Sequence, residues 1–421
     1  MLANILLVLT SILLLYFFLK RKEGIILSFF VVFPSIFSFL LNESGIEGFS
    51  LFFRYAFFVL LILSSFKIWR HQKLLNFNSY FTSLLLLTSS MLLFNQFSSN
   101  GDNVEVAIFQ QSFFLYVFFP VIVVLLVLRN QKAISEFIIS IPYWGMLYAL
   151  IFILFFELDR IDLMNRITFV ETTGFDTIAA SRIFGLSFII SIVSLFKPGK
   201  RIYQSFLFSV LVLFNIVFLL IVGQRGTILG VFFGMTVFVL YTVRKENIPY
   251  YVLIIMTIFS VFYFKIIDLT QFEVFQRFYH LKYYQEYERY ADYANVWKIF
   301  KENWYFFGEG SWGYRFLTGR VYPHNIILEC ISDYGLIGFI SILSIVTYSV
   351  YCSFKIMKNN DDAIGKVIVA TWLVLLSSVF VSGNLNSNAI FFIYTSMLTA
   401  FYRINYSNNR SIVINKSQIH A

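Results

Sequence analysis

The chain is short of charge, cysteine and histidine. Charged residues make up 13% of its 421 residues, and hydrophobic residues make up 59%. A soluble domain carries roughly 25% charged residues, so this composition excludes a soluble globular protein. The two cysteines, Cys330 and Cys352, fall in one apolar segment at a separation of about six helical turns, which excludes a disulfide framework.

Motifs for metal and nucleotide chemistry are also missing. The four histidines show no His-x-x-His spacing and no Asp-x-Asp pair occurs, so we expect no metal site. Neither a Walker motif nor a nucleophile elbow is present. The Gly-x-Gly-x-x-Gly match at residues 308–313 lacks the surrounding strand and helix that a dinucleotide site requires. We therefore expect no cofactor.

Long apolar runs recur along the whole chain. A helix of about 20 apolar residues crosses a hydrocarbon core of roughly 30 Å. The predicted fold class is an all-α polytopic membrane protein with about 13 (12–14) transmembrane helices and one large external loop that contains short amphipathic helices. The first run lacks the basic segment of a signal peptide, so we interpret it as a retained helix. The predicted spans are residues 2–19, 24–41, 51–66, 78–97, 107–128, 134–156, 177–196, 202–222, 226–243, 248–267, 325–354, 364–383 and 388–403.

Basic residues gather in alternate loops between these spans. Residues 20–22, 67–73, 197–201 and 403–416 are examples, whereas the opposite loops hold most of the acids. By the positive-inside rule the basic side is cytoplasmic, which places the N-terminus outside and the C-terminus in the cytoplasm. This bias accounts for the net charge of +9, so we expect no nucleic-acid partner.

The charge pattern puts the longest polar loop outside. The chain then divides into N-terminal transmembrane helices (1–206), transmembrane helices that carry an Arg225 turn (207–267), the large external loop (268–323), C-terminal transmembrane helices (324–403) and a cytoplasmic tail (404–421).

The external loop is too aromatic to be a linker. Tyr283, Tyr287, Ala291, Ala294 and Trp297 recur at helical spacing, which predicts a helix lying flat on the outer leaflet. Its aromatic residues are either membrane-belt residues or platforms that stack on sugar rings. The glycines between 308 and 313 predict a flexible turn.

The loop ends in a polar motif that opens an apolar run. His324 and Asn325 come first, and Glu329 lies about one helical turn beyond Asn325, so these two share a helix face. Polar groups that enter a membrane are costly and usually functional. His324 is either a structural helix cap or a functional group. Gly335 and Gly338 are most simply close helix-packing positions.

Two arginines border apolar runs. Arg225 is either an ordinary turn residue that snorkels to the headgroups or a guanidinium that binds a large anion between Gly223 and Gly226. Arg182, near the start of its predicted span, is either a snorkelling residue or a substrate contact.

Together these motifs resemble the superfamily of O-antigen polymerases and O-antigen ligases. The resemblance covers roughly residues 207–342. Its departures are Gln224, where the family usually has a small hydroxyl residue, and a predicted thirteenth span. The motifs that carry it are the Arg turn 222–227, the segment from Trp297 through Phe307-Gly308-Glu309-Gly310, the His324-Asn325-Ile-Ile-Leu328-Glu329 element and Gly335-Leu-Ile-Gly338.

The resemblance implies a glycosyltransferase of the bacterial inner membrane whose active site faces the periplasm. Such enzymes move a glycan from an undecaprenyl-diphosphate carrier without metal or nucleotide sugar. Fixed arginines would then hold the diphosphate, with Arg225 first, Arg289 second, and Arg277 and Lys282 weaker candidates. His324 would be the general base, or would hydrogen-bond a phosphate oxygen. The further substrate-binding candidates are Asn325, Glu329, Arg182, Trp297, Trp312 and Tyr322.

The acceptor decides between the possible activities. A polymerase adds the growing glycan to the next lipid-linked repeat unit, and we favour it; an O-antigen ligase adds it to lipid A–core. The partners expected besides the lipid-linked oligosaccharide are membrane lipids, a chain-length regulator and a flippase. A transporter of lipid-linked sugars is the alternative from another class, but it predicts repeated halves with broken helices, and no such repeat is present.

Overall fold

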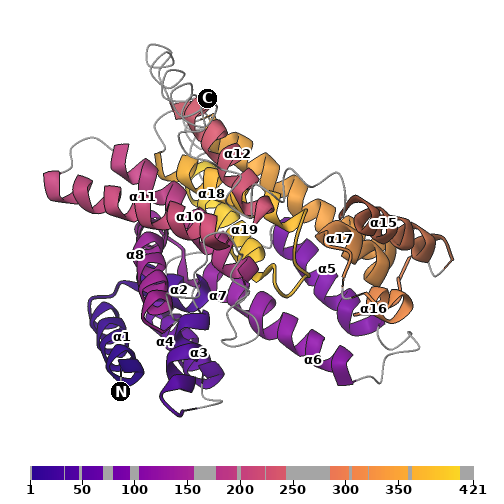
Figure 1. The fold of residues 1–421 in the computed structure, drawn as a ribbon, viewed down its shortest axis with the longest axis horizontal. Coiled ribbons are helices and arrows are strands. Elements are labelled where there is room, and N and C mark those ends of the chain that lie inside the picture. The colour runs from indigo at the N-terminus through magenta and orange to yellow at the C-terminus, as the bar shows by residue number, and fades with distance from the viewer. Residues whose placement is uncertain are drawn as a thin grey trace, which may run out of the picture. The chain divides into compact units, whose positions relative to one another are not determined.

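The computed structural model describes residues 2–32, 34–46, 50–69, 79–94, 104–155, 177–196, 201–222, 224–242, 285–302, 306–320, 322–358 and 363–407 (Figure 1). These residues form helices joined by turns, and no β-strand occurs among them. The predicted helical class is therefore confirmed.

The helices of the first half of the chain are α1 (Leu2–Leu19), α2 (Glu23–Val32), α3 (Pro34–Glu43), α4 (Ser50–Trp69), α5 (Ser79–Phe94), α6 (Val104–Phe113), the π-helical turn η1 (Phe114–Phe118), α7 (Phe119–Val127), α8 (Gln131–Phe155) and α10 (Thr177–Phe196). Those of the second half are α11 (Ile202–Val222), α12 (Arg225–Thr242), α15 (Gln285–Glu302), α16 (Gly313–Thr318), α17 (Ile326–Met357), α18 (Ala363–Val379), α19 (Ala389–Tyr402) and the π-helical turn η6 (Arg403–Ser407).

Six of the described helical stretches are long and apolar enough to cross a membrane, so this is a multi-pass membrane protein. The predicted count of about 13 is not confirmed. Within the predicted span 24–41 the structure describes α2 and α3, which lie on either side of residue 33, a position outside the described residues. The predicted span 248–267 lies outside the described residues. The six are Leu2–Leu19, Val104–Val127, Gln131–Phe155, Ile178–Leu195, Ile202–Val222 and Ile326–Met357.

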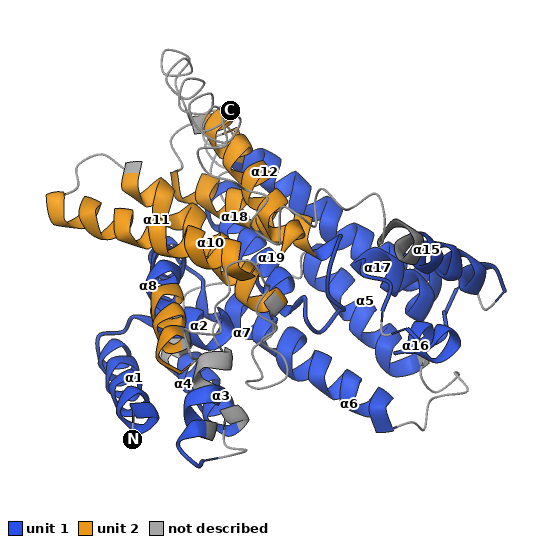
Figure 2. Cartoon of the chain, in the orientation of Figure 1, with its two compact units in different colours: residues 1–144, 289–356, 379–421 blue, residues 145–288, 357–378 orange. Residues whose placement is uncertain are grey.

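The chain forms two compact units (Figure 2). Unit 1 comprises residues 1–144, 289–356 and 379–421, and unit 2 comprises residues 145–288 and 357–378. In unit 1, α19 is the central helix, since every residue from Ile390 to Phe401 is buried. Its neighbours include α7, and the hydroxyl of Tyr80 in α5 donates a hydrogen bond to the carbonyl of Phe392 at 2.7 Å.

Unit 2 packs α10, α11, α12 and α18 with close backbone contacts. A Cβ atom added to Gly230 of α12 would lie 2.7 Å from the carbonyl oxygen of Val374 in α18. One added to Gly234 would lie 2.5 Å from that of Ala370. Small residues at such spacing let membrane helices approach each other, because lipid supplies no hydrophobic drive for their association.

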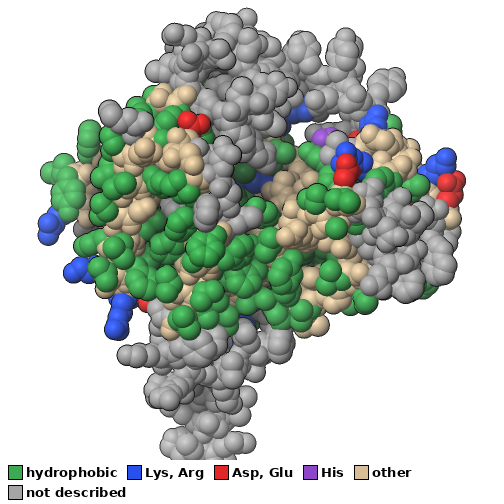
Figure 3. All heavy atoms as spheres, turned by 90° about the horizontal axis from the view of Figure 1, so that it is seen from below, with side chains coloured by type: hydrophobic (Ala, Val, Ile, Leu, Met, Phe, Trp, Pro, Cys, Tyr) green, Lys and Arg blue, Asp and Glu red, His purple; other side chains and the backbone are tan. Residues whose placement is uncertain are grey.

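The surface carries many large apolar side chains. Hydrophobic side chains cover much of the described part of the face shown in Figure 3. On α1, Ile5, Ile12 and Leu19 are 47%, 59% and 72% exposed. Such exposure is unfavourable in water but suits a helix face that meets lipid.

Candidate functional site

The segment before α16 is held against α17 by backbone hydrogen bonds. The amide of Glu309 donates to the carbonyl of Ser332 at 3.2 Å, and the amide of Gly310 donates to that of Asp333 at 2.7 Å. Gly313 N–H closes the turn on the Gly310 carbonyl at 2.9 Å. The turn predicted at 308–313 is therefore present, and two of its amides are paired with α17.

α17 is kinked where this segment docks. Gly335 has φ 57° and ψ −148°, values outside the helical region, inside a helix that otherwise runs from Ile326 to Met357. A Cβ on Gly335 would lie 2.7 Å from the carbonyl carbon of Phe306. Gly335 is thus a close-packing position as predicted, but its partner is the docked segment and not another helix.

Asp333 links α17 to the start of α16. Its Oδ1 accepts hydrogen bonds from the amide of Tyr314 at 2.9 Å and from the hydroxyl of Ser332 at 3.3 Å. One residue on, the hydroxyls of Tyr334 and Ser311 lie 2.9 Å apart. These buried polar groups fix α16 over the first turns of α17.

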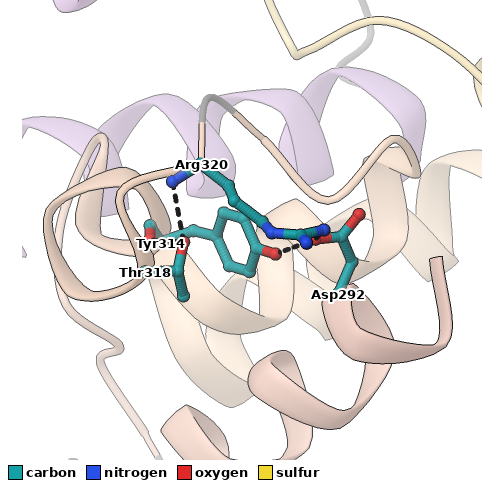
Figure 4. Close-up of polar contacts among 4 residues, drawn as sticks. All are labelled: Asp292, Tyr314, Thr318 and Arg320. Carbon is teal, nitrogen blue, oxygen red and sulfur yellow. Dashed lines mark hydrogen bonds and ion pairs between the residues drawn. The ribbon is translucent and has the colours of Figure 1, made fainter. Parts of the chain in front are cut away.

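Asp292 of α15 joins the same assembly (Figure 4). Its Oδ1 accepts a hydrogen bond from the Tyr314 hydroxyl at 2.6 Å and an ion pair from Arg320 Nη1 at 2.7 Å. Arg320 also donates its backbone amide to the Thr318 hydroxyl at 3.2 Å. Burial, helped by the bond to Asp292, raises the pKa of Tyr314, so the phenol stays protonated as a donor.

A small apolar core lies beneath these contacts. Val296, Ile299 and Tyr314 form it, with Leu328 and Ile331 packed against it. The predicted helix of the long loop is thus confirmed as α15. The face of α15 that packs on this core carries Asp292, Val296 and Ile299, whereas Trp297 of the predicted apolar stripe is 56% exposed, which suits the predicted contact with the outer leaflet. Asp292 takes a place on the buried face because Tyr314 and Arg320 satisfy its carboxylate.

Asn325 and Glu329 both face residues 380–388, which join α18 to α19. Asn325 Oδ1 caps α17 by accepting from the amides of Ile327 (2.9 Å) and Leu328 (3.3 Å), and its Nδ2 donates to the carbonyl of Phe380 at 3.1 Å. Buried Glu329 accepts from the amide of Leu385 at 2.9 Å. The shared helix face predicted for the pair is confirmed.

His324 lies just before this cap. Its backbone has φ 56°, a left-handed conformation that is rare outside glycine and asparagine. The side chain is exposed, and its ring meets the ring of Tyr322 edge to face with centroids 4.6 Å apart. A backbone outlier between buried Pro323 and a capped helix is the kind of strain that accompanies functional positions.

Trp312 also has a left-handed backbone, with φ 65°. Its ring packs edge to face on Phe109 of α6 at 5.0 Å and carries the guanidinium of Arg315 at 4.7 Å. Arg315 also forms an ion pair with Glu105, with 3.2 Å between Nη1 and Oε2. The indole Nε1 is buried and has no hydrogen-bond partner among the described residues.

The predicted arginines take different places. In unit 2, Arg182 is completely buried and donates from Nε to Ser378 Oγ at 2.8 Å, which is not the position of a snorkelling residue. Arg225, half-buried, is the first residue of α12. Arg289 lies in the described part of α15, but its side chain is not described. Arg277 and Lys282 lie outside the described residues.

Several residues of the site were missed by the sequence interpretation. For Asp292 the available signal was an acid at i, i+4 and i+7 spacing with Val296 and Ile299. Asp333 could be found from the same helical spacing, because it lies four residues after Glu329 in the helix that follows His324. For the 380–388 connection the available signal was the alternation of Asn384, Asn386 and Asn388 between two apolar runs.

A family model described as O-antigen ligase matches residues 207–343. The matched region contains Arg225, the docked segment with α15 and α16, and the first part of α17. No curated protein matches the chain.

Proposed function

We propose that this membrane protein is a polymerase of the superfamily of O-antigen ligases and polymerases, which joins undecaprenyl-diphosphate-linked oligosaccharide repeat units into O-antigen or a related surface polysaccharide at the outer face of the inner membrane. The family match over residues 207–343 supports the superfamily. The observation that carries the proposal is His324, an exposed imidazole held on a left-handed backbone at the mouth of a capped, apolar helix.

His324 acts as the general base. The imidazole takes the proton of the acceptor hydroxyl as the hydroxyl oxygen bonds to the anomeric carbon of the donor glycan. The bond between that carbon and the diphosphate oxygen breaks, and undecaprenyl diphosphate leaves with the bonding electrons. The Asn325 cap and the Tyr322 ring hold the histidine in place.

Arg225 and Arg289 stabilise the departing diphosphate. Arg225 stands at the beginning of α12, where the positive end of the helix dipole adds to its charge. Fixed cations suit this step because charge builds up on the leaving oxygen in the transition state. Arg277 and Lys282 remain weaker candidates for the same role.

Aromatic groups contact the sugars. Trp297 projects from α15 with 56% of its surface exposed, and Trp312 has a buried indole N–H that no described residue accepts. Flat apolar faces pack against the C–H faces of sugar rings, and an unpaired N–H suits a sugar hydroxyl. Glu329 and Arg182 remain proposed contacts, although each also has a partner within the chain.

The second candidate function is O-antigen ligation, which the description of the matching family favours. The chemistry is identical, and only the acceptor changes to lipid A–core. In both cases the expected protein partners are a flippase that delivers the lipid-linked donor and, for the polymerase, a chain-length regulator.

Deletion of the gene followed by gel analysis of the surface polysaccharide separates these functions. A single capped repeat unit indicates the polymerase. Bare core with accumulated lipid-linked polymer indicates the ligase. Loss of outward-facing lipid-linked units indicates a flippase and contradicts the proposal.

A further inference from the structure

The connection between α18 and α19, residues 380–388, is polar and uncharged. Its sequence is Phe-Val-Ser-Gly-Asn-Leu-Asn-Ser-Asn, in a chain that is 59% hydrophobic. Gly383 has φ 82°, a left-handed conformation that turns the backbone after α18. Uncharged amides and hydroxyls on a loop that is partly open to the surface suit a neutral ligand rich in hydroxyl groups. The half-buried polar residues of the connection are Ser382, Asn384, Asn386 and Ser387.

Two contacts fix this connection to the first turns of α17. The carbonyl of Phe380 accepts a hydrogen bond from Asn325 Nδ2 at 3.1 Å, and the amide of Leu385 donates to Glu329 Oε2 at 2.9 Å. Glu329 is buried, and it lies about one helical turn beyond Asn325. The connection therefore lies beside the start of α17, which directly follows His324.

A third contact links the connection to the tryptophan that is proposed to contact sugars. Asn386 Nδ2 donates to the carbonyl of Phe109 in α6 at 3.1 Å. The ring of Phe109 meets the ring of Trp312 edge to face, with centroids 5.0 Å apart. The same short segment thus joins the end of α17 that carries the proposed base to the residue on which Trp312 packs.

The side-chain amide of Asn384 is fixed in orientation. Its Oδ1 accepts from the amide of Ser387 at 2.8 Å, and its own backbone amide donates to Ser387 Oγ at 2.8 Å. The Ser387 hydroxyl in turn donates to the Asn384 carbonyl at 3.0 Å. Because Oδ1 accepts from a backbone N–H, Nδ2 is the group that remains, and it makes no hydrogen bond within the described part of the chain. A donor held in place on a half-buried residue is preorganised for an acceptor atom of a ligand.

We propose that residues 380–388 form one wall of the glycan site, in which Asn384 Nδ2 donates a hydrogen bond to a sugar hydroxyl oxygen. This inference rests on the proposed glycosyl transfer and adds to it a residue that recognises the sugar. The ligand is the glycan and not the diphosphate, because the connection contains no basic residue and its neighbour Glu329 is a carboxyl group. The connection follows residues 207–343, so it lies outside the region that the family model matches.

The test measures equilibrium binding to the purified full-length protein in a maltoside detergent. The probe is the lipid-linked glycan that accumulates in cells lacking the gene, released from its carrier by mild acid and radiolabelled. Undecaprenyl diphosphate serves as the probe without sugar. Elongation of the intact lipid-linked glycan is measured in the same preparations, and thermal unfolding checks that each variant is folded.

Three variants isolate the Nδ2 donor. Asn384→Asp keeps the oxygen that accepts from Ser387 and removes the donor. Asn384→Ala removes the donor without adding a charge. Asn405→Asp is the control with the same change of charge, at a half-buried asparagine that follows the other end of α19.

We expect the wild type and Asn405→Asp to bind the released glycan equally. Both Asn384 variants should bind it about three- to tenfold more weakly, the effect of one lost hydrogen bond, and should bind undecaprenyl diphosphate as the wild type does. Unchanged glycan affinity in both Asn384 variants, an equal loss for undecaprenyl diphosphate, or a wild type that binds no glycan would overturn the inference. A wild type that binds the glycan but elongates nothing would contradict the proposed polymerase, while the binding data still decide the role of Asn384.

Discussion

Gly308, in the segment before α16, and Gly335, at the kink of α17, lie backbone against backbone. A Cβ on Gly308 would lie 2.5 Å from the amide nitrogen of Gly335, and one on Gly335 would lie 2.7 Å from that of Gly308. Both have positive φ, at 67° and 57°. Because neither residue has a side chain, the two backbones can pack directly against each other. This contact holds the segment that carries Trp312 against α17.

Gly308→Ala should destabilise the protein through both conformation and clash. An alanine at positive φ costs about 1 kcal/mol, and the forced contact adds about 1–3 kcal/mol. Gly319→Ala is the matched control, because Gly319 has φ 69° but open space around it. Thermal unfolding in detergent measures the difference between the two variants. Equal shifts would mean that the contact with Gly335 contributes nothing.

Asp292→Ala should loosen the assembly of α15 and α16 more than Tyr314→Phe does. The aspartate satisfies both Tyr314 and Arg320, whereas Tyr314→Phe removes phenol hydrogen bonds of about 1 kcal/mol each and keeps the ion pair between Asp292 and Arg320. Limited proteolysis of the loop and thermal unfolding report the effect. Tyr290→Phe, at an exposed tyrosine on the same helix, should change neither.

Asn325→Ala should cost about 1 kcal/mol of stability, because α17 loses its N-cap. Asn325→Asp keeps the accepting oxygen but loses the donor to Phe380, so it should be affected less. The order of their unfolding midpoints checks this. A reversed order would contradict the capping role of the Oδ1 atom, because both variants lack the bond to Phe380 and only Asn325→Asp keeps a capping oxygen.

Ser378→Ala should destabilise unit 2 by about 1.5–3 kcal/mol, since it removes an acceptor from the completely buried Arg182. Ser377→Ala, at the half-buried neighbouring serine of α18, is the control. Unfolding in detergent compares the two. If both variants unfold at the wild-type temperature, Arg182 does not depend on Ser378.

The sequence predicted those features that depend on local pattern. Apolar runs gave the membrane helices, and helical spacing of Tyr and Ala residues gave α15. The shared face of Asn325 and Glu329 follows from helix geometry alone, whereas the residue considered as a helix cap was His324 and the structure places the cap at Asn325. The motif from His324 to Gly338 also carried the family resemblance that the match to residues 207–343 supports.

Features that depend on distant partners were not predictable in this way. The buried face of α15 is chosen by Tyr314 and Arg320, which meet Asp292 only after the loop has folded. Gly335 looks like an ordinary helix-packing glycine until Phe306 and Gly308 dock beside it.

The backbone of His324 offers the most direct test of the proposed mechanism. His324→Gly removes the imidazole but suits the φ of 56°, so the protein should be inserted and at least as stable as the wild type. The length distribution of surface polysaccharide is then measured in cells whose only copy is this variant. We predict single capped repeat units without polymer. A normal ladder of polymer from His324→Gly would contradict a catalytic role for this residue.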